Sequence, residues 1–191
     1  MNLPKLCTLA DYTKPELIIP QLTTRTTTSV MQELTTALRR EDGSVPDQLS
    51  SSTAALIREL LTSTALDFGA VFPRVRVAAL SRPRFALGRS TESLPWRASG
   101  FLPTELVFLI LEPAKPDAEY GQLVRTLHSL GRDRLHLDGL RRATNVEEIL
   151  AVLAQIPLVA ASEQVRVPAV SPVPAHINPS PRAVSFRRWR H

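Results

Sequence analysis

Five arginines lie within sixteen residues of one another, and arginine is the residue best suited to hold an anion. They are Arg74, Arg76, Arg82, Arg84 and Arg89. A guanidinium can bind a phosphate or a carboxylate through two parallel hydrogen bonds, so Arg74, Arg76 and Arg82 are candidates for an anion- or partner-binding site. Alternatively, these side chains are solvated and keep the edge of a sheet from pairing with another chain. The residue types leave both interpretations open.

Arg74 stands at a distinctive place in this cluster. The stretch DFGAVFPRVRV, residues 67–77, has a glycine before a short apolar run and Pro73 after it. This pattern predicts a strand that ends in a Pro-Arg turn, followed by a second extended run. Such a turn would present the side chain at position 74 to a ligand or a partner.

Most other chemistry is excluded by the inventory of residues. The chain has no Gly-Lys-Ser/Thr phosphate loop, no His-Glu-x-x-His zinc helix and no Gly-x-Ser-x-Gly elbow. One cysteine, Cys7, allows no internal disulfide, and one cysteine with four histidines is too few for a metal cage. We therefore expect no metal site and no cofactor.

The apolar pattern predicts an α/β fold. Leucines recur at helical spacing in four segments and short apolar runs bounded by Pro or Gly mark three strands, with a further extended run at 17–19. The helices are predicted at 29–40, 46–61, 118–130 and 144–156, and the strands at 69–73, 84–88 and 105–113. Residues 106–111 are all apolar, as in a strand covered on both faces. The expected architecture is a mixed sheet flanked by helices on both faces.

Charge divides the chain into a body, residues 1–157, and a tail, residues 158–191. The body holds 18 Lys and Arg against 17 Asp and Glu, and the tail holds 5 against 1. Five prolines and the lack of apolar periodicity predict a disordered tail. Its last residues, Arg187, Arg188, Trp189 and Arg190, could contact an acidic surface, lipid headgroups or RNA, or could simply be solvated. The nearly neutral body argues against nucleic acid as the main partner.

No segment of the sequence has the pattern of a membrane span. A span needs about 20 consecutive apolar residues, and no run in this chain approaches that length. The first residues, MNLPKLCTLADYTKPE, lack the apolar core of a signal peptide. We expect a soluble, cytoplasmic protein.

The order of the segments from about residue 9 to residue 156 is similar to that of a known protein family. It resembles the enzyme IIA proteins of the bacterial phosphoenolpyruvate-dependent sugar phosphotransferase system, in the fructose/mannitol and nitrogen-regulatory class. The matching segments are LADYTKPELII, SVMQELTTALRR, AALIRELLTSTAL, GAVFPR, TELVFLILEPAKP, AEYGQLVRTLHSL and TNVEEILAVL. The resemblance implies the α/β sandwich of that family.

The resemblance also implies a phosphoryl site, and the chain departs from it in three places. In the family a histidine closes the "GIAIPH" turn, accepts a phosphoryl group from the phosphocarrier protein HPr and passes it to a sugar-transporting IIB partner. Here Arg74 holds that position, Tyr120 holds the position of a second family histidine, and the glycine-rich approach has become STALDFG. A guanidinium stays protonated and has no lone pair for attack on phosphorus. The resemblance thus implies a degenerate member, a pseudoenzyme.

The remaining histidines do not restore the motif. His128 and His136 lie away from the motif positions, and each is predicted to be a partly exposed structural histidine. His176 and His191 lie in the tail, where no neighbouring group is held in place for catalysis.

Three functional hypotheses follow. The first is a regulatory protein that works by binding a protein partner: an HPr-like carrier, a transporter or a sensor kinase. The second is an active phosphocarrier in sugar transport with an atypical acceptor. The third is an anion- or nucleic-acid-binding module that uses the basic tail.

Overall fold

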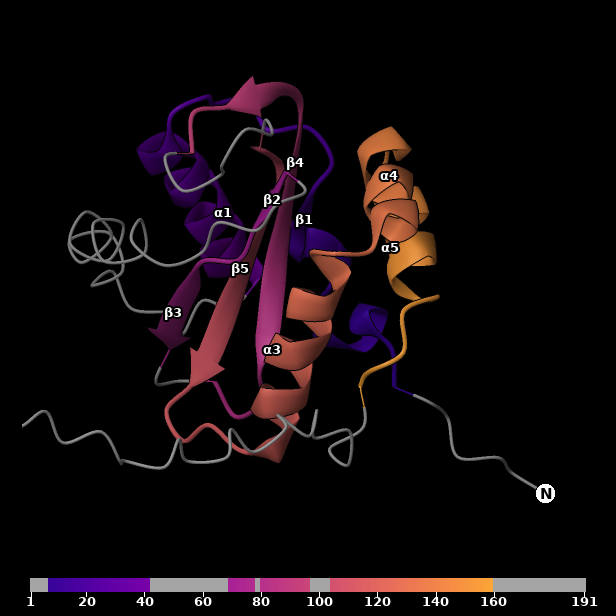
Figure 1. The fold of residues 1–191 in the computed structure, drawn as a ribbon. Coiled ribbons are helices and arrows are strands. Elements are labelled where there is room, and N and C mark those ends of the chain that lie inside the picture. The colour runs from indigo at the N-terminus through magenta and orange to yellow at the C-terminus, as the bar shows by residue number, and fades with distance from the viewer. Residues whose placement is uncertain (1–6, 42–68, 78–79, 97–103, 160–191) are drawn as a thin grey trace, which may run out of the picture.

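The computed structural model describes residues 7–41, 69–77, 80–96 and 104–159 (Figure 1). The helix predicted at 46–61, most of the STALDFG segment and the tail from residue 160 onward lie outside these ranges. The division of the chain at residue 157 therefore stays a prediction. Within the described ranges, no helix has both the length and the apolar character that crossing a membrane requires.

The centre of the fold is a sheet of five strands. In hydrogen-bonding order these are β1 (Ile18–Ile19), β4 (Arg84–Leu94), β5 (Thr104–Pro113) and β2 (Ala70–Val71), and β3 (Arg74–Val77) also pairs with β5. The central pair, β4 and β5, is antiparallel, whereas the other pairs are parallel. The sheet is therefore mixed, as the sequence predicts.

The strands β2 and β3 lie end to end along β5, which corrects the predicted turn. Ala70 pairs with Leu106 and Arg74 pairs with Ile110, so the offset of 36 residues is the same on both sides of Pro73. Pro73 has no N–H to donate, but its carbonyl accepts a hydrogen bond from the Ile110 nitrogen at 2.7 Å. Arg74 does not occupy a turn after a finished strand. It opens the second half of an interrupted strand.

Helices cover both faces of the sheet (Figure 1). One face is covered by α1, and the other by α3, α4 and α5 together with a short 3-10 turn, η1; a second 3-10 turn, η2, leads into β1. The bounds are α1 Thr27–Glu41, α3 Ala118–Leu130, α4 Arg134–Arg142, α5 Val146–Leu153, η1 Leu9–Tyr12 and η2 Pro15–Leu17. The predicted α/β architecture is confirmed.

The strand β5 contributes to both cores because successive side chains of a strand point to opposite faces. Leu106, Phe108 and Ile110 pack in the core beneath α3, α4 and α5, and the alternate residues pack in the core beneath α1. These alternate residues are Val107, Leu109 and Leu111. All six are fully buried, which confirms the prediction of a strand covered on both faces.

Candidate functional site

Arg74 reaches from the interrupted strand to the neighbouring helix α3. Its Nη2 atom lies 3.0 Å from Nε2 of His128, a residue 54 positions further along the chain. A guanidinium can only donate, so the imidazole accepts at Nε2 and carries its own proton on Nδ1. His128 was predicted to lie outside the site, but the structure places it in direct contact with Arg74.

His128 is held in the state that accepts this hydrogen bond. Burial lowers its pKa, and the positive charges of Arg74 and Arg132 lower it further. The imidazole lies edge-on to the Phe72 ring, with the ring centroids 6.1 Å apart and an interplanar angle of 71°. His128 is therefore a neutral, half-buried acceptor at neutral pH.

Tyr120 and Arg76 meet on a shared carboxylate beside this pair. The Tyr120 hydroxyl donates to Oε2 of Glu112 at 3.2 Å, and Arg76 donates to Oε1 through Nε at 3.1 Å and Nη2 at 2.5 Å. Burial raises the pKa of Tyr120 and the Glu112 charge adds to this, whereas Arg74 opposes it through its charge and a hydrogen bond. The structure thus brings Arg74 and Tyr120 into the same site.

Arg82 belongs to a separate group on the same side of the sheet. It pairs with Glu119, which also accepts a hydrogen bond from the Tyr12 hydroxyl at 2.9 Å, and it lies over the Tyr12 ring at 5.9 Å from the centroid. Arg82 lowers the pKa of Glu119. Burial, followed by the contact with Glu119, raises the pKa of Tyr12 to about 12.

The predicted cluster of arginines therefore does not converge on one pocket. Arg76 is committed to Glu112 and Arg82 to Glu119, so both cations are neutralised within the protein. Arg89 is buried and donates to the backbone carbonyls of Arg141 at 2.7 Å and Pro20 at 3.0 Å, which makes it a structural clamp. Of the three arginines proposed for an anion site, only Arg74 has no carboxylate partner among the described residues.

The spacing between Tyr120 and His128 in the sequence is a signal that could have placed His128 in the site. Tyr120 and His128 are eight residues apart on α3, which is two helical turns and about 80° more, so both can lie on the side of the helix that faces the sheet edge. His136, by contrast, is committed elsewhere. Its Nδ1 atom lies 2.6 Å from Oδ2 of Asp133, the residue that caps α4.

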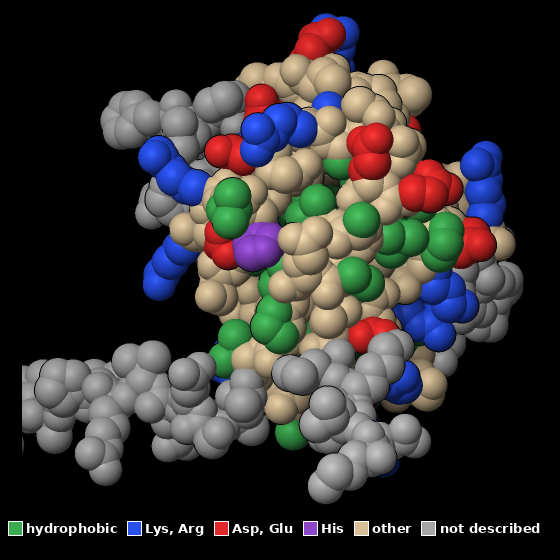
Figure 2. Space-filling view, turned by 90° about the vertical axis from the view of Figure 1, so that its right-hand side faces the viewer, with side chains coloured by type: hydrophobic (Ala, Val, Ile, Leu, Met, Phe, Trp, Pro, Cys, Tyr) green, Lys and Arg blue, Asp and Glu red, His purple; other side chains and the backbone are tan. Residues whose placement is uncertain are grey.

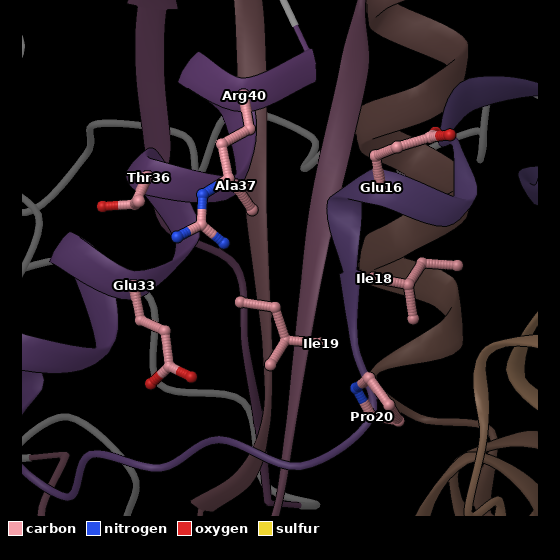
Figure 3. Close-up of a pocket in the computed structure, with 8 residues that line it drawn as sticks. All are labelled: Glu16, Ile18, Ile19, Pro20, Glu33, Thr36, Ala37 and Arg40. Atoms are coloured by element: carbon pink, nitrogen blue, oxygen red, sulfur yellow. The ribbon is translucent and has the colours of Figure 1, made fainter.

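A hollow of the described surface lies away from these residues. It has a volume of about 620 Å³ and opens between α1 and the segment that runs from η2 to Pro20 (Figure 3). Glu33, on its α1 side, accepts hydrogen bonds from the backbone nitrogens of Thr23 and Thr24. The residues around Arg74, here called the Arg74 group, are Arg74, Arg76, Glu112, Tyr120 and His128. None of them lines this cavity. The described residues also contain no group of histidine, cysteine and acidic side chains able to hold a metal.

The surface next to α4 and α5 carries apolar side chains among charged ones. Figure 2 shows them as a broken patch with acidic and basic side chains around it. Leu135, on α4, is 75% exposed. No ion pair of the Arg74 group extends onto α4 or α5 in the described structure.

Comparison with known proteins places this geometry in context. Residues 11–156 match the family described as "Phosphoenolpyruvate-dependent sugar phosphotransferase system, EIIA 2". The chain is 32% identical over 117 residues to the fructose-specific EIIA component of Haloferax volcanii, a match that covers 60% of this chain and 74% of that protein. It is 26% identical over 153 residues to the nitrogen regulatory protein of Bradyrhizobium diazoefficiens, covering 80% and 99%.

Solved structures agree on the fold. The nitrogen regulatory protein IIA-Ntr of Neisseria meningitidis superposes with a TM-score of 0.60 at 23% identity, covering 76% of this chain and 98% of that one. A chain from the complex of mannitol enzyme IIA with phosphorylated mannitol enzyme IIB of Escherichia coli superposes with a TM-score of 0.54 at 20% identity, covering 75% and 99%. These likenesses establish the sheet with its flanking helices.

Proposed function

Because the chain belongs to the phosphoenolpyruvate-dependent sugar phosphotransferase system EIIA 2 family, we propose that it is a regulatory member that acts by binding a protein partner rather than by carrying a phosphoryl group. The observation that carries this proposal is the state of Arg74. The sequence resemblance assigns Arg74 to the position of the phosphorylated histidine, and its guanidinium donates to His128. A permanently protonated donor cannot form a bond to phosphorus through a lone pair.

The surroundings of Arg74 support the same proposal. Tyr120, which the resemblance assigns to the second histidine position, is a hydrogen-bond donor to Glu112, and burial holds its phenol in the protonated form. Neither position therefore offers the neutral nitrogen that phosphoryl transfer requires. What remains of the site is a set of donors and charges, which suits recognition.

The partner belongs to the same system. One relative is named as a nitrogen regulatory protein, and one structural neighbour was solved in complex with a phosphorylated enzyme IIB. By analogy, the candidates are an HPr-like carrier, a transporter component and a sensor kinase, and the protein would meet them in the cytoplasm.

A phosphoryl-transfer assay tests the proposal. The purified full chain is incubated with radiolabelled phosphoenolpyruvate, enzyme I and HPr, with an active EIIA protein of the same system as the positive control. The proposal expects label on enzyme I, HPr and the control but none on this chain. Acid-labile label on this chain would refute it.

A second candidate function rests on one contact. His128 is neutral and lies 3.0 Å from a fixed cation, so its Nε2 lone pair could attack a phosphohistidine phosphorus after Arg74 turns away. The new P–N bond would form on His128 as the donor P–N bond breaks, and the donor imidazole would keep the electron pair and take a proton. Label that appears on the wild type and disappears in His128→Gln would establish this active phosphocarrier with an atypical acceptor.

A further inference from the structure

Arg74, Arg76 and Arg82 use the guanidinium edge formed by Nε and Nη2 in two different ways. Arg76 places Nε and Nη2 on the Glu112 carboxylate, and Arg82 places the same two nitrogens on the Glu119 carboxylate. Arg74 directs Nη2 at an imidazole nitrogen and its guanidinium also interacts with the Tyr120 hydroxyl, but its Nε is buried with no hydrogen-bond partner among the described residues. The edge that fits two oxygens is therefore only half used in Arg74.

The hydrogen bonding of Arg74 is incomplete in this arrangement, and a bound anion could complete it. A buried donor without an acceptor is destabilising, and a neutral imidazole is a weaker acceptor than an oxyanion. An incoming anion with two free oxygens could accept from both Nε and Nη2 of Arg74. The guanidinium would then leave Nε2 of His128.

Release of Nε2 changes the chemistry of His128. The charged groups that act on His128 in the described structure are Arg74, from β3, and Arg132, just after α3, and both are positive. An anion on Arg74 cancels one of these charges and frees the lone pair that had been accepting. The imidazole can then bind a proton and become a further donor to the same anion.

We propose that Arg74 and His128 form a receptor for a phosphoryl dianion carried by a protein partner, and that His128 takes up a proton when the dianion binds. This deepens the proposed function, on which it rests, by naming the chemistry that the partner presents. The charges favour a dianion, because Arg74, Arg132 and the protonated His128 together supply three positive charges. Glu112, the neighbouring acid, is already paired with Arg76.

The proton uptake is tested with sulfate, an oxyanion that stays divalent between about pH 5 and 8, where histidine titrates. The ring-proton signals of His128 and His136 are followed by NMR against pH, with and without sulfate, at constant ionic strength. Sulfate should raise the pKa of His128, whereas the ring signals of His136, which is held by Asp133 on α4, should not respond to added sulfate. Between the free and bound pKa values, sulfate affinity should rise by up to about tenfold for each unit by which the pH falls.

Three variants assign the effect to its residues. Arg74→Gln should lose sulfate binding, and the matched control Arg25→Gln, whose wild-type arginine is exposed and paired with Glu92, should keep it. His128→Gln should still bind sulfate, but with an affinity that no longer changes with pH. A spectrum with native dispersion confirms that each variant is folded.

The source of the dianion is tested with HPr held in its phosphorylated form by phosphoenolpyruvate and enzyme I. Phosphorylated HPr should bind the wild type more tightly than HPr does, and Arg74→Gln should abolish the difference. Equal binding of both HPr forms to the wild type would overturn the assignment to a partner, and a His128 pKa unmoved by sulfate would overturn the receptor itself. Label transferred to this chain would instead overturn the proposed function, whatever sulfate does.

Discussion

Replacement of Arg89 by methionine should destabilise the fold more than removal of a surface arginine that has a carboxylate partner. Arg89 is 8% exposed and joins β4 to the carbonyl of Arg141 at 2.7 Å and to that of Pro20 at 3.0 Å. Hydrogen bonds to a charged group contribute about 1.5–3 kcal/mol each. Removal of a buried charge also relieves its desolvation cost, so the lower end of that range applies. Arg89→Met should therefore lower the free energy of unfolding by about 3 kcal/mol.

The matched control lies next to the same strand. Arg25 pairs with Glu92 of β4 at 2.5 Å, but its side chain is 69% exposed, and such a pair contributes at most about 1 kcal/mol. Urea unfolding followed by circular dichroism measures both variants, and equal m-values confirm that the comparison concerns the folded state. If Arg89→Met loses no more stability than Arg25→Met, the reasoning that the buried carbonyl contacts hold α4 against the sheet is wrong.

Two further changes test the core and the Tyr12 group. Phe108→Ala should lower the free energy of unfolding by about 3–5 kcal/mol in the same urea assay, because the ring is fully buried and stacks on Phe72 at 5.0 Å; a loss below about 1 kcal/mol would contradict the packing. Tyr12 has its pKa raised from 10.0 to about 12, so its neutral form contributes stability that is complete below pH 10 and is lost as the pH rises toward 12. Tyr12→Phe, which cannot ionise, should therefore lose less stability than the wild type over that interval in alkaline unfolding curves, and parallel curves would refute the assignment.

The core of the fold could be predicted from the sequence because burial leaves a direct pattern. An unbroken apolar run, as in β5, requires cover on both faces, and two opposed layers of helix follow from it. Gly69 was also readable as the start of a strand. It has a positive φ of 76°, a conformation that suits glycine, and its carbonyl accepts from the nitrogens of Glu105 and Leu106.

The errors arise where tertiary contacts override local pattern. Pro73 suggested a turn, but the sheet continues past it because the Pro73 carbonyl accepts a hydrogen bond from β5 although Pro73 has no N–H to donate.

The strand β4 runs to Leu94, well beyond the predicted end at residue 88. Its second half was missed because it is polar and its apolar residues do not alternate regularly. Gly88 looked like a strand terminator, yet it serves close packing: a Cβ there would lie 2.9 Å from Leu22. The helix α4 was not predicted; its nine residues include a glycine and three arginines.

The candidate site was predictable in part. Arg74 and Tyr120 were identified through the family motif, and the structure brings them together. The contact between Arg74 and His128 was missed because it joins residues 54 positions apart on different elements, and no local pattern reports such a contact. The commitment of Arg76 and Arg82 to Glu112 and Glu119 was hidden for the same reason.

The central claim is that a guanidinium at position 74 has turned a phosphoryl carrier into a binding protein. Intact-mass spectrometry of the full chain, kept at alkaline pH after exposure to phosphoenolpyruvate, enzyme I and HPr, tests it most directly. The account predicts an unmodified chain beside phosphorylated HPr in the same sample. A phosphoramidate on His128, or on any other residue of this chain, would contradict it.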